Sequence, residues 1–403
     1  MPTPISRTKA VHDLLALARP AEPVTLAPVD AVGLTAALDV AALCDVPERA
    51  CSVRDGYAVR SADVAGAKPL HPVRLTVGEC IRAESPDPAL VAEGATARVL
   101  TGGLVPPGAD AVLAEEDVET DGDAILVREP VRKGWFVRAA GGEIPSGTGV
   151  AREGQIITPQ AAAVMTRTRV TGVSAHPRPL ARIMALGSEL AAPGGRETGL
   201  ERFPADNLIL LRGLFDQAGA SVEQTGVIPD NCDELVRFLS GPLPEIAITT
   251  GGTGNSERDF AFEAATRAGF TEVFKRIDIR PGRNMFAAHR DSTLLFGLPG
   301  PPAAVHACFH AVILPVIRRL RGLPDQTEPL KARFTQPINT RPGSEWLVQC
   351  ELALKGATLY ATPYAGKSVP PMFGLSQANG LAILQSNTTL VPGDEAEVLT
   401  TFF

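Results

Sequence analysis

The sequence predicts a multidomain protein in which a central parallel-sheet α/β domain is combined with β-rich domains. The chain has 403 residues, which is too long for one ordinary hydrophobic core. From residue 180 onward, apolar strand-like runs alternate with helical patterns, and this alternation builds a parallel sheet covered on both faces. Short β-type runs separated by Gly, Pro and Asp turns fill residues 45 to 137 and again residues 327 to 403.

The first third of the chain changes character twice. We expect residues 7 to 43 to be helical, because Ala and Leu recur at spacings of three and four in AVHDLLALARP and again further on. The runs PVRLTVG, ARVL, DAVLAEEDV and AILVREPV then predict short strands. Residues 138 to 178 contain one predicted helix, TPQAAAVMTR, with Thr158 as a good N-cap and Pro159 as a good first helical residue.

The α/β segment follows from the periodicity of its apolar residues. ARIMALG and ASVEQTGVI predict strands, whereas ADNLILLRGLFDQAG and DELVRFLSG predict helices. EIAITT and STLLFG predict two further strands, each followed by a glycine turn and then a helix. After RGLPDQ, the runs TRPGSEWLVQCELAL, ATLYATPY, GLAILQS and EAEVLTTFF predict strands only, so a small β-domain closes the chain.

Composition and charge narrow the classes of function. The net charge of −7 and the pI near 5.5 argue against a general nucleic-acid or anionic-membrane surface and favour a small-molecule partner. No apolar run is long enough to cross a membrane and the N-terminus lacks a signal-peptide pattern, so we expect a cytoplasmic protein. The cysteines form no C-x-x-C pair, which favours ordinary reduced thiols: Cys44, Cys51, Cys80, Cys232, Cys308 and Cys350.

Three turns follow strands of the predicted sheet: LGSEL at 186 to 190, TTGGTGNSERD at 249 to 259 and GLPGPP at 297 to 302. Ligands of open parallel sheets bind at the carboxyl ends of the strands, where these turns would meet. Glycines let the backbone approach a ligand with N–H groups pointing outward, and a following helix N-terminus favours a phosphate. Taken singly, each turn is equally well explained as a plain strand-to-helix connection. None is a Walker loop or a G-x-G-x-x-G fingerprint.

Charged residues near this edge of the sheet indicate how a phosphate and a cation can be held. In KRIDIRPGRN, Arg276 and Arg280 fall on one face of a predicted strand, and with Arg283 they can clamp a phosphate; a solvated edge strand is the alternative. Carboxylates suit Mg²⁺, although surface acids are often merely solvated. The acids near this edge are Glu189, Asp206, Asp230 and Asp259.

A second possible metal site is HACFH, because His306 and His310 share one helical face with Cys308 between them. The surrounding helix is apolar, which favours core packing over metal binding. No Ser or Cys nucleophile motif such as G-x-S-x-G occurs, so we do not expect hydrolysis through a covalent intermediate.

Nine segments occur in a fixed order: RDGYAV, TGGLVPPGADAVLAEED, VRAAGGEIPSG, LGSEL, DNLILL, TTGGTGNSERDF, RPGRNMF, GLPGPPAAV and ANGLAIL. Any one of them alone is weak, whereas nine in order are specific. Together they resemble the molybdopterin molybdotransferase family, which includes bacterial MoeA and the E-domain of gephyrin, over essentially the whole chain.

The resemblance implies an elongated, MoeA-like homodimer with four domains. Residues 1–44 plus 138–178 would form a segmented stalk, 45–137 a β-rich domain inserted in it, 179–326 a molybdopterin-binding α/β domain and 327–403 a C-terminal β-domain. The implied reaction inserts molybdate into adenylylated molybdopterin with Mg²⁺ and releases AMP. Implied partners are other cofactor-biosynthesis proteins or an acceptor molybdoenzyme, with no nucleic acid and no membrane.

The resemblance also assigns roles by position. The implied catalytic residues are Asp55, Thr101, Glu189 and Asp259, and the implied metal ligands are Glu189, Asp259 and Asp206. Asp55 and Thr101 resemble residues that reach the active site of the partner subunit, and Arg276 and Arg280 stand where the family has lysines. The residues implied to bind the pterin nucleotide are Gly251, Gly252, Thr253, Gly254, Arg276, Arg280, Arg283, Pro299, Gly300 and Pro302.

The chain departs from the family pattern at several contacts. Gly254 replaces a serine of the glycine turn, and Pro301 and Ala304 replace an asparagine and a serine of the third turn. In the last domain, Phe373 and Gly374 replace paired serines. Two alternatives therefore stay open: a non-catalytic paralogue that binds molybdopterin or its nucleotide as a carrier in cofactor delivery, and a nucleotide pyrophosphate hydrolase on the same fold.

Overall fold

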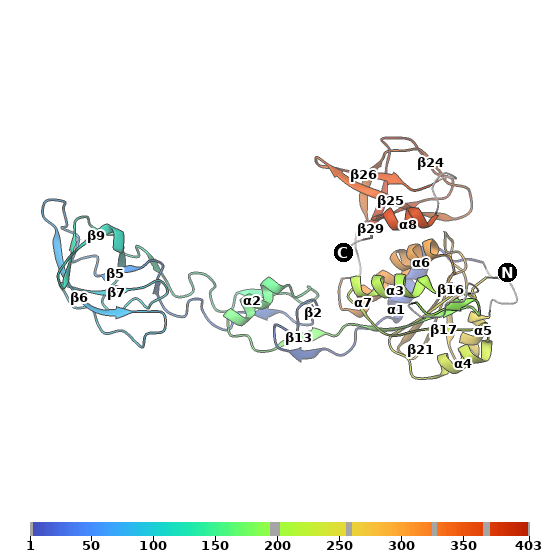
Figure 1. Ribbon diagram of the computed structural model, residues 1–403, viewed down its shortest axis with the longest axis horizontal. Helices are drawn as coiled ribbons and strands as arrows, with labels where there is room; N and C mark the ends of the chain where they lie inside the picture. The colour runs from blue at the N-terminus through green and yellow to red at the C-terminus, as the bar shows by residue number, and fades with distance from the viewer. Residues whose placement is uncertain (1–2, 194–201, 255–259, 325–328, 366–370, 402–403) are drawn as a thin grey trace.

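The computed structural model describes residues 3–193, 202–254, 260–324, 329–365 and 371–401. The described chain is elongated (Figure 1). A β-rich domain lies at one end, a narrow stalk connects it to an α/β domain, and a C-terminal β-domain lies beside the α/β domain at the other end. This architecture confirms the predicted combination of a central α/β domain with β-rich domains.

The β-rich domain is built on one six-stranded sheet. Its strands are β5 (Gly56–Val59), β6 (Val73–Ile81), β7 (Ala95–Val99), β8 (Ala111–Ala114), β9 (Val118–Asp121) and β10 (Ala124–Val127), and a short 3₁₀ turn, η1 (Glu115–Asp117), follows β8. The strand order is β8-β5-β7-β6-β10-β9, with β6 and β7 parallel. Both faces of β5 are buried, because Tyr57 and Val59 pack in one core and Ala58 in another.

The stalk consists of small sheets and one helix, and the chain passes through it twice (Figure 1). The predicted helix TPQAAAVMTR is confirmed: Thr158 Oγ1 accepts a hydrogen bond from the Ala161 N–H at 3.1 Å, and Pro159 is the first helical residue. The elements are β1 (Val24–Leu26), β2 (Thr35–Ala36), β3 (Val40–Ala41), β4 (Cys51–Ser52), β11 (Val137–Arg138), β12 (Gly149–Ala151), α2 (Pro159–Arg167) and β13 (Val173–His176).

The helix predicted for residues 7 to 43 ends at Leu17, so the prediction is wrong for residues 18 to 43. Ala18 already has an extended backbone, with φ −69° and ψ 128°. Pro20 follows shortly after; a proline lacks the N–H that a helix needs and disfavours helical backbone in the residue before it. The apolar spacing further along this segment therefore belongs to short strands and turns.

Helix α1 (Arg7–Leu17) packs on the α/β domain and is not part of the stalk, in contrast to the implied assignment of residues 1–44. Ala10 and Leu14 are fully buried in the α/β core, which is the apolar stripe that a short helix can bury. The Arg7 Nε atom lies 2.6 Å from the Glu345 carboxylate of the C-terminal domain. The first helix thus joins the two lobes at that end.

The α/β domain has a six-stranded sheet with the order β17-β14-β18-β22-β21-β19. The first four strands run parallel, as predicted, whereas β21 and β19 are antiparallel additions. Its strands are β14 (Leu180–Leu186), β17 (Ser221–Ile228), β18 (Ile246–Thr250), β19 (Thr271–Phe274), β21 (Phe286–Arg290) and β22 (Thr293–Leu298), and a small parallel pair is formed by β15 (Leu190–Ala191) and β16 (Phe203–Pro204).

Helices cover both faces of this sheet. One core contains α1 together with α3 (Asp206–Gln217), α6 (Pro302–Cys308) and α7 (Leu314–Leu320), and the other contains α4 (Cys232–Ser240) and α5 (Ala261–Arg267). A π-helical turn, η2 (Phe309–Ile313), joins α6 to α7 into one helix. This 19-residue helix is long and apolar enough to cross a membrane, but 72% of its apolar window is buried inside the protein, as in a core helix.

The C-terminal domain is a sheet closed through pairing of its strands β25 (Glu345–Lys355) and β27 (Gly380–Leu384). Leu347 packs toward the α/β core while Val348 packs inside the domain, as alternation along a strand requires. The prediction of strands only is wrong for α8 (Pro371–Gln377). The other elements are β20 (Ile279–Arg280), β23 (Leu330–Phe334), β24 (Ile338–Asn339), β26 (Thr358–Pro363), β28 (Thr389–Leu390) and β29 (Glu395–Thr400).

Candidate active site

A cavity of about 430 Å³ lies at the carboxyl ends of β14, β18 and β22, which are neighbours in the sheet. Residues from all three predicted turns line it, so the fold brings these turns together where parallel sheets bind ligands. Its polar lining consists of Glu189, Asp206, Asn207, Asp230 and Thr250, with the backbone of Gly251, Gly252 and Gly300.

Gly251 of the second turn is required by close backbone packing. Gly251 has a φ of +93°, and a Cβ atom there would lie 2.7 Å from the Leu186 carbonyl oxygen. The Gly251 N–H donates to the Leu298 carbonyl at 2.9 Å and so does not point outward, in contrast to the expectation for this turn. The reason is that β18 and β22 are parallel neighbours, and their hydrogen bonding continues past the strand ends.

Three carboxylates surround the cavity, and two of them accept hydrogen bonds from the protein itself. Asp206 opens α3, and its Oδ1 accepts from the Asn207 N–H at 2.9 Å. Asp230 Oδ2 accepts from the Ser188 N–H at 3.3 Å, and the Asp230 N–H donates to Ser188 Oγ at 2.9 Å. Glu189 lies in the same turn as Ser188. Asp230 thus ties the turn after β17 to the turn after β14 at the cavity wall.

The carboxylates fit a shared cation better than a self-contained metal site. Among the described residues, no group of three or more His, Cys, Asp or Glu side chains is placed to hold a metal ion. Mg²⁺, however, is usually held by one or two carboxylates together with waters and substrate phosphates. Glu189, Asp206 and Asp230 fit this mode, and Asp259 lies outside the described residues.

A directional chain of hydrogen bonds, which we call the Asn207 relay, crosses one wall of the cavity. Asn207 Nδ2 donates to Thr250 Oγ1 at 2.9 Å and to the Gly300 carbonyl at 2.7 Å. Thr250 Oγ1 in turn donates to the Pro299 carbonyl at 3.1 Å. The relay ties the start of α3 to the end of β18 and to the loop after β22. The sequence analysis assigns no role to Asn207 or Thr250. Polar residues do occur in pairs at the end of β18 and at the start of α3, and such pairs can indicate a site.

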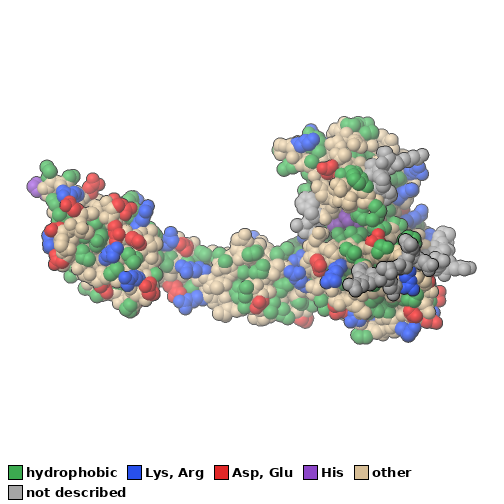
Figure 2. Space-filling view, in the orientation of Figure 1, with side chains coloured by type: hydrophobic (Ala, Val, Ile, Leu, Met, Phe, Trp, Pro, Cys, Tyr) green, Lys and Arg blue, Asp and Glu red, His purple; other side chains and the backbone are tan. Residues whose placement is uncertain are grey.

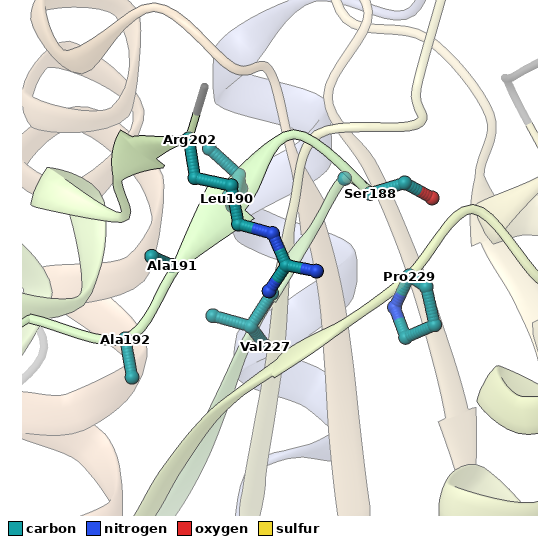
Figure 3. A pocket seen from close by; sticks show the side chains of 8 residues that line it. Ser188, Leu190, Ala191, Ala192, Arg202, Val227 and Pro229 are labelled. Atoms are coloured by element: carbon teal, nitrogen blue, oxygen red, sulfur yellow. The ribbon is translucent and has the colours of Figure 1, made fainter. Parts of the chain in front are cut away.

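A second cavity, of about 440 Å³, shares the turn after β14. Arg202 extends into it toward Val227, with Pro229 and Ser188 on the other side (Figure 3). The remaining side chains that line it, Leu190, Ala191 and Ala192, are apolar. The second cavity thus adds volume and the Arg202 guanidinium group beside the acidic cavity. Together the two cavities have room for a ligand larger than one phosphate.

The three arginines of the predicted phosphate clamp do not line either cavity. Arg276 and Arg280 do not share one regular strand, because β20 contains only Ile279 and Arg280 and pairs with β25 of the C-terminal sheet. The Arg280 guanidinium lies over the Trp346 ring, 4.8 Å from its centre. Arg283 is exposed nearby in the chain. Ile277 and Ile279 of this segment are fully buried in the core of the α/β domain.

The other implied nucleotide-binding residues lie along the same loops. Pro299 belongs to the Asn207 relay, because its carbonyl accepts the hydrogen bond from Thr250. Pro302 is the first residue of α6. Thr253 and Gly254 continue the turn past Gly252 and are not among the residues that line the cavity.

Asp55 and Thr101 form a separate polar pair in the β-rich domain. Asp55 Oδ1 accepts hydrogen bonds from the backbone N–H of Thr101 at 2.7 Å and from its Oγ1 at 2.8 Å. These bonds, the backbone one foremost, lower the pKa of the Asp55 carboxyl. The pair adjoins the start of β5 and the end of β7, in the domain that the stalk separates from the α/β domain (Figure 1).

His306 and His310 are buried in the core helix with their ring centres 4.5 Å apart. Burial lowers the pKa of His306 to about 4 and that of His310 to about 3, so both are neutral near pH 7. Cys308 packs against Gly282, and burial raises its pKa to about 12. Cys308 belongs to the α/β core cluster and both histidines are buried, so their surroundings favour core packing.

Comparison with known proteins decides the family. Residues 5–168 match the model described as the MoeA N-terminal region (domain I and II), and residues 182–319 match that of a probable molybdopterin binding domain, which includes every residue lining the first cavity. A protein of Mycobacterium tuberculosis named molybdopterin molybdenumtransferase 2 is 31% identical over 337 residues, covering 80% of this chain and 82% of that protein. The chain belongs to the molybdopterin molybdenumtransferase family.

Other members and structures agree. A molybdopterin molybdenumtransferase of Staphylococcus aureus is 27% identical over 351 residues, covering 86% of this chain and 83% of that protein. Two structures of a molybdopterin biosynthesis MoeA protein from Pyrococcus horikoshii share the fold, with TM-scores of 0.84 and 0.75, identities of 23% and 24%, and coverage of 99% and 98% of this chain and 99% of theirs. The family resemblance, the MoeA-like fold and the prediction of a transferase enzyme are confirmed.

Proposed function

We propose that this protein inserts molybdate into adenylylated molybdopterin and releases AMP, with Mg²⁺, as a step of molybdenum cofactor biosynthesis. The observation that carries the proposal is the first cavity, where turns from three neighbouring strands bring acids, glycine backbone and the Asn207 relay together. The cavity lies within the segment that matches the molybdopterin-binding model. The names of the relatives support the transferase reaction.

The reaction needs stabilisation of charge on a phosphoanhydride and does not need a nucleophilic side chain. A bound Mg²⁺ supplies Lewis acidity at the phosphate oxygens. Glu189, with Asp206 and Asp230 in the same cavity, would hold it jointly with the phosphates, and we propose Asp259 as a further acid. Gly251 and Gly252 let the backbone come close to the nucleotide. Because the Gly251 N–H is already bonded, the proposed donors are the N–H groups that follow it in the turn, first that of Gly252, which lines the cavity, and then those of Thr253 and Gly254.

We propose that the working unit is a homodimer in which Asp55 and Thr101 of one copy complete the cavity of the other. Within one chain these residues lie beyond the stalk from the cavity, so they do not serve it in cis (Figure 1). The stalk region also carries large apolar side chains that are well exposed: Val29 at 73%, Leu38 at 60% and Leu43 at 65%. Exposed apolar surface of this kind is typical of contacts between proteins.

We also propose a cytoplasmic location and transfer of the product to another cofactor-biosynthesis protein or to an acceptor molybdoenzyme. All six cysteines are free thiols in the structure, which suits a reducing compartment.

The test is AMP release from adenylylated molybdopterin by the purified protein with Mg²⁺, with and without molybdate, beside the variant Asp259→Ala. We expect molybdate-dependent release that the variant loses. Tight binding of molybdopterin without AMP release would contradict the proposal and favour the carrier. AMP release that does not depend on molybdate would favour a nucleotide pyrophosphate hydrolase.

A further inference from the structure

The orientation of the Asn207 side-chain amide is fixed by its partners. The Gly300 carbonyl oxygen can only accept a hydrogen bond, so the atom that lies 2.7 Å from it must be the Nδ2 donor. A flipped amide would place Oδ1 against that carbonyl oxygen. The assignment of nitrogen and oxygen therefore follows from the geometry of the cavity wall.

Thr250 uses up the second hydrogen of the amide nitrogen. The hydroxyl of Thr250 has one proton, which goes to the Pro299 carbonyl because that oxygen also can only accept. Thr250 Oγ1 must then accept from Asn207 Nδ2 at 2.9 Å. Both hydrogens of the amide are committed to the protein, and the amide oxygen is what remains to interact with anything else.

Asn207 Oδ1 is a buried acceptor that has no hydrogen-bond partner among the described residues. The residue is only 7% exposed, and it lines the first cavity. Buried polar atoms in native proteins are nearly always satisfied, so an acceptor that the protein leaves unsatisfied at a binding cavity is available to a ligand, a water molecule or a cation. Among the groups of an organic ligand, only a hydrogen-bond donor can satisfy this acceptor.

The surroundings of Asn207 narrow the chemistry of that ligand. Glu189, Asp206 and Asp230 line the same cavity, so this wall is rich in acceptors. Phosphate oxygens are also acceptors and do not match Oδ1, whereas an N–H or O–H group does. Building on the proposed function, we propose that Asn207 selects the ligand, because its Oδ1 accepts a hydrogen bond from a neutral N–H of the pterin or O–H of the ribose of the bound nucleotide.

The test uses binding of two ligands, AMP and molybdopterin, measured by calorimetry with and without Mg²⁺. The variant Asn207→Ser shortens the side chain and withdraws the amide oxygen, and Thr250→Val breaks the relay while leaving that oxygen in place. Thr249→Val is the matched control: Thr249 is on the same strand, is 1% exposed and has a buried hydroxyl without a hydrogen-bond partner in the described structure. The wild-type protein is also measured with 2′-deoxy-AMP and 3′-deoxy-AMP.

We expect Asn207→Ser to lower the affinity for one of the two ligands about tenfold and to leave the affinity for the other within twofold. The reason is that a single hydrogen bond to a neutral donor is lost. Weaker AMP binding, matched by the same loss for one deoxy-AMP in the wild-type protein, places the donor on the ribose. Weaker molybdopterin binding alone places it on the pterin. Thr250→Val should show a smaller loss for the same ligand, and Thr249→Val none.

Equal losses for both ligands would overturn the inference, since they indicate either a general structural role or, if seen only with Mg²⁺, a bond from Oδ1 to the cation. Unchanged affinity for both would overturn it as well. Failure of the wild-type protein to bind either ligand would overturn the proposed function together with this inference. Binding that is insensitive to Asn207 would overturn the inference alone.

Discussion

The β-rich domain and the α/β domain each present a prepared carboxylate, but they prepare it in different ways. Asp55 is exposed and is held by two hydrogen bonds from a single neighbouring residue, Thr101, within one domain. The acids of the cavity come from turns that the sheet of the α/β domain brings together. Each half is organised without the other, and the stalk separates them (Figure 1). We therefore expect a site that uses both halves to be built from two copies of the chain.

The largest effect is expected at the cavity. Glu189→Gln should lower the rate of AMP release about 10²- to 10³-fold, because it removes a negative charge that would hold the cation at the phosphoanhydride. Thermal stability should stay unchanged, since Glu189 is exposed. Asp233→Asn, which changes an exposed acid on α4 that pairs with Arg267, is the control and should keep full activity. Activity of Glu189→Gln close to that of the control would mean that the cavity is not the reaction centre.

A smaller loss of activity is expected from a substitution in the β-rich domain. Asp55→Ala should lower AMP release about 10- to 100-fold, as removal of one positioned polar group commonly does. Binding of AMP to the cavity should persist, because the α/β domain is organised independently. Glu129→Gln, an exposed acid of the same domain, serves as the control. Loss of AMP binding in Asp55→Ala, measured by calorimetry, would show that the two halves are not independent.

A lower pH should destabilise the α/β domain more than the β-rich domain. His306 and His310 are neutral when folded, with pKa values lowered to about 4 and 3, whereas unfolded histidine binds a proton near pH 6.5. Near and below pH 6.5 the unfolded state therefore binds more protons than the folded state. The free energy of unfolding falls by about 1 kcal/mol for each histidine between pH 7.5 and pH 6.

The two tryptophans can report this difference. Trp135 packs in the β-rich domain, and Trp346 lies on β25 beside the α/β domain. In single-tryptophan variants, Trp135→Phe and Trp346→Phe, the urea midpoint should fall from pH 7.5 to pH 6 for the Trp346 signal and stay nearly constant for the Trp135 signal. His71→Gln is the control. Equal shifts of both signals would contradict the account of the buried histidines.

The smallest expected effect concerns the pKa of Asp55. Thr101→Val removes the hydroxyl donor but keeps the backbone N–H, so the pKa of the Asp55 carboxyl should rise part of the way toward its ordinary value. The carboxylate would then lose its charge at a higher pH than in the wild-type protein. An NMR titration of the carboxyl carbon checks this, with Thr120→Val on β9 as the control. A pKa that does not move would mean that the backbone bond alone holds Asp55.

Sequence reasoning predicted those parts of the fold that depend on local periodicity. The apolar runs of the α/β domain became strands and helices where expected, and the three turns met at one edge because parallel strands require it. The helix predicted beyond Leu17 failed because prolines override apolar spacing. The position of α1 was missed, since the partner that buries Ala10 and Leu14 cannot be read from the helix itself.

The site was predicted less completely, because its details depend on contacts between distant segments. Glu189 and Asp206 line the cavity, whereas Arg280 lies against the C-terminal domain because β20 joins its sheet. The Asn207 relay depends on distances between α3 and two loops, which no local pattern specifies.

The most direct test of the central claim, that the two separated halves meet between copies, is the activity of a mixed dimer. A chain with Asp55→Ala and a chain with Glu189→Ala are given different tags, coexpressed, and purified through both tags. One site of the mixed dimer then has both wild-type residues and the other has neither, so we predict about half of the wild-type AMP release, far above either variant homodimer. Release no higher than that of the variant homodimers would contradict the claim, because each chain would then carry one defect in its own site.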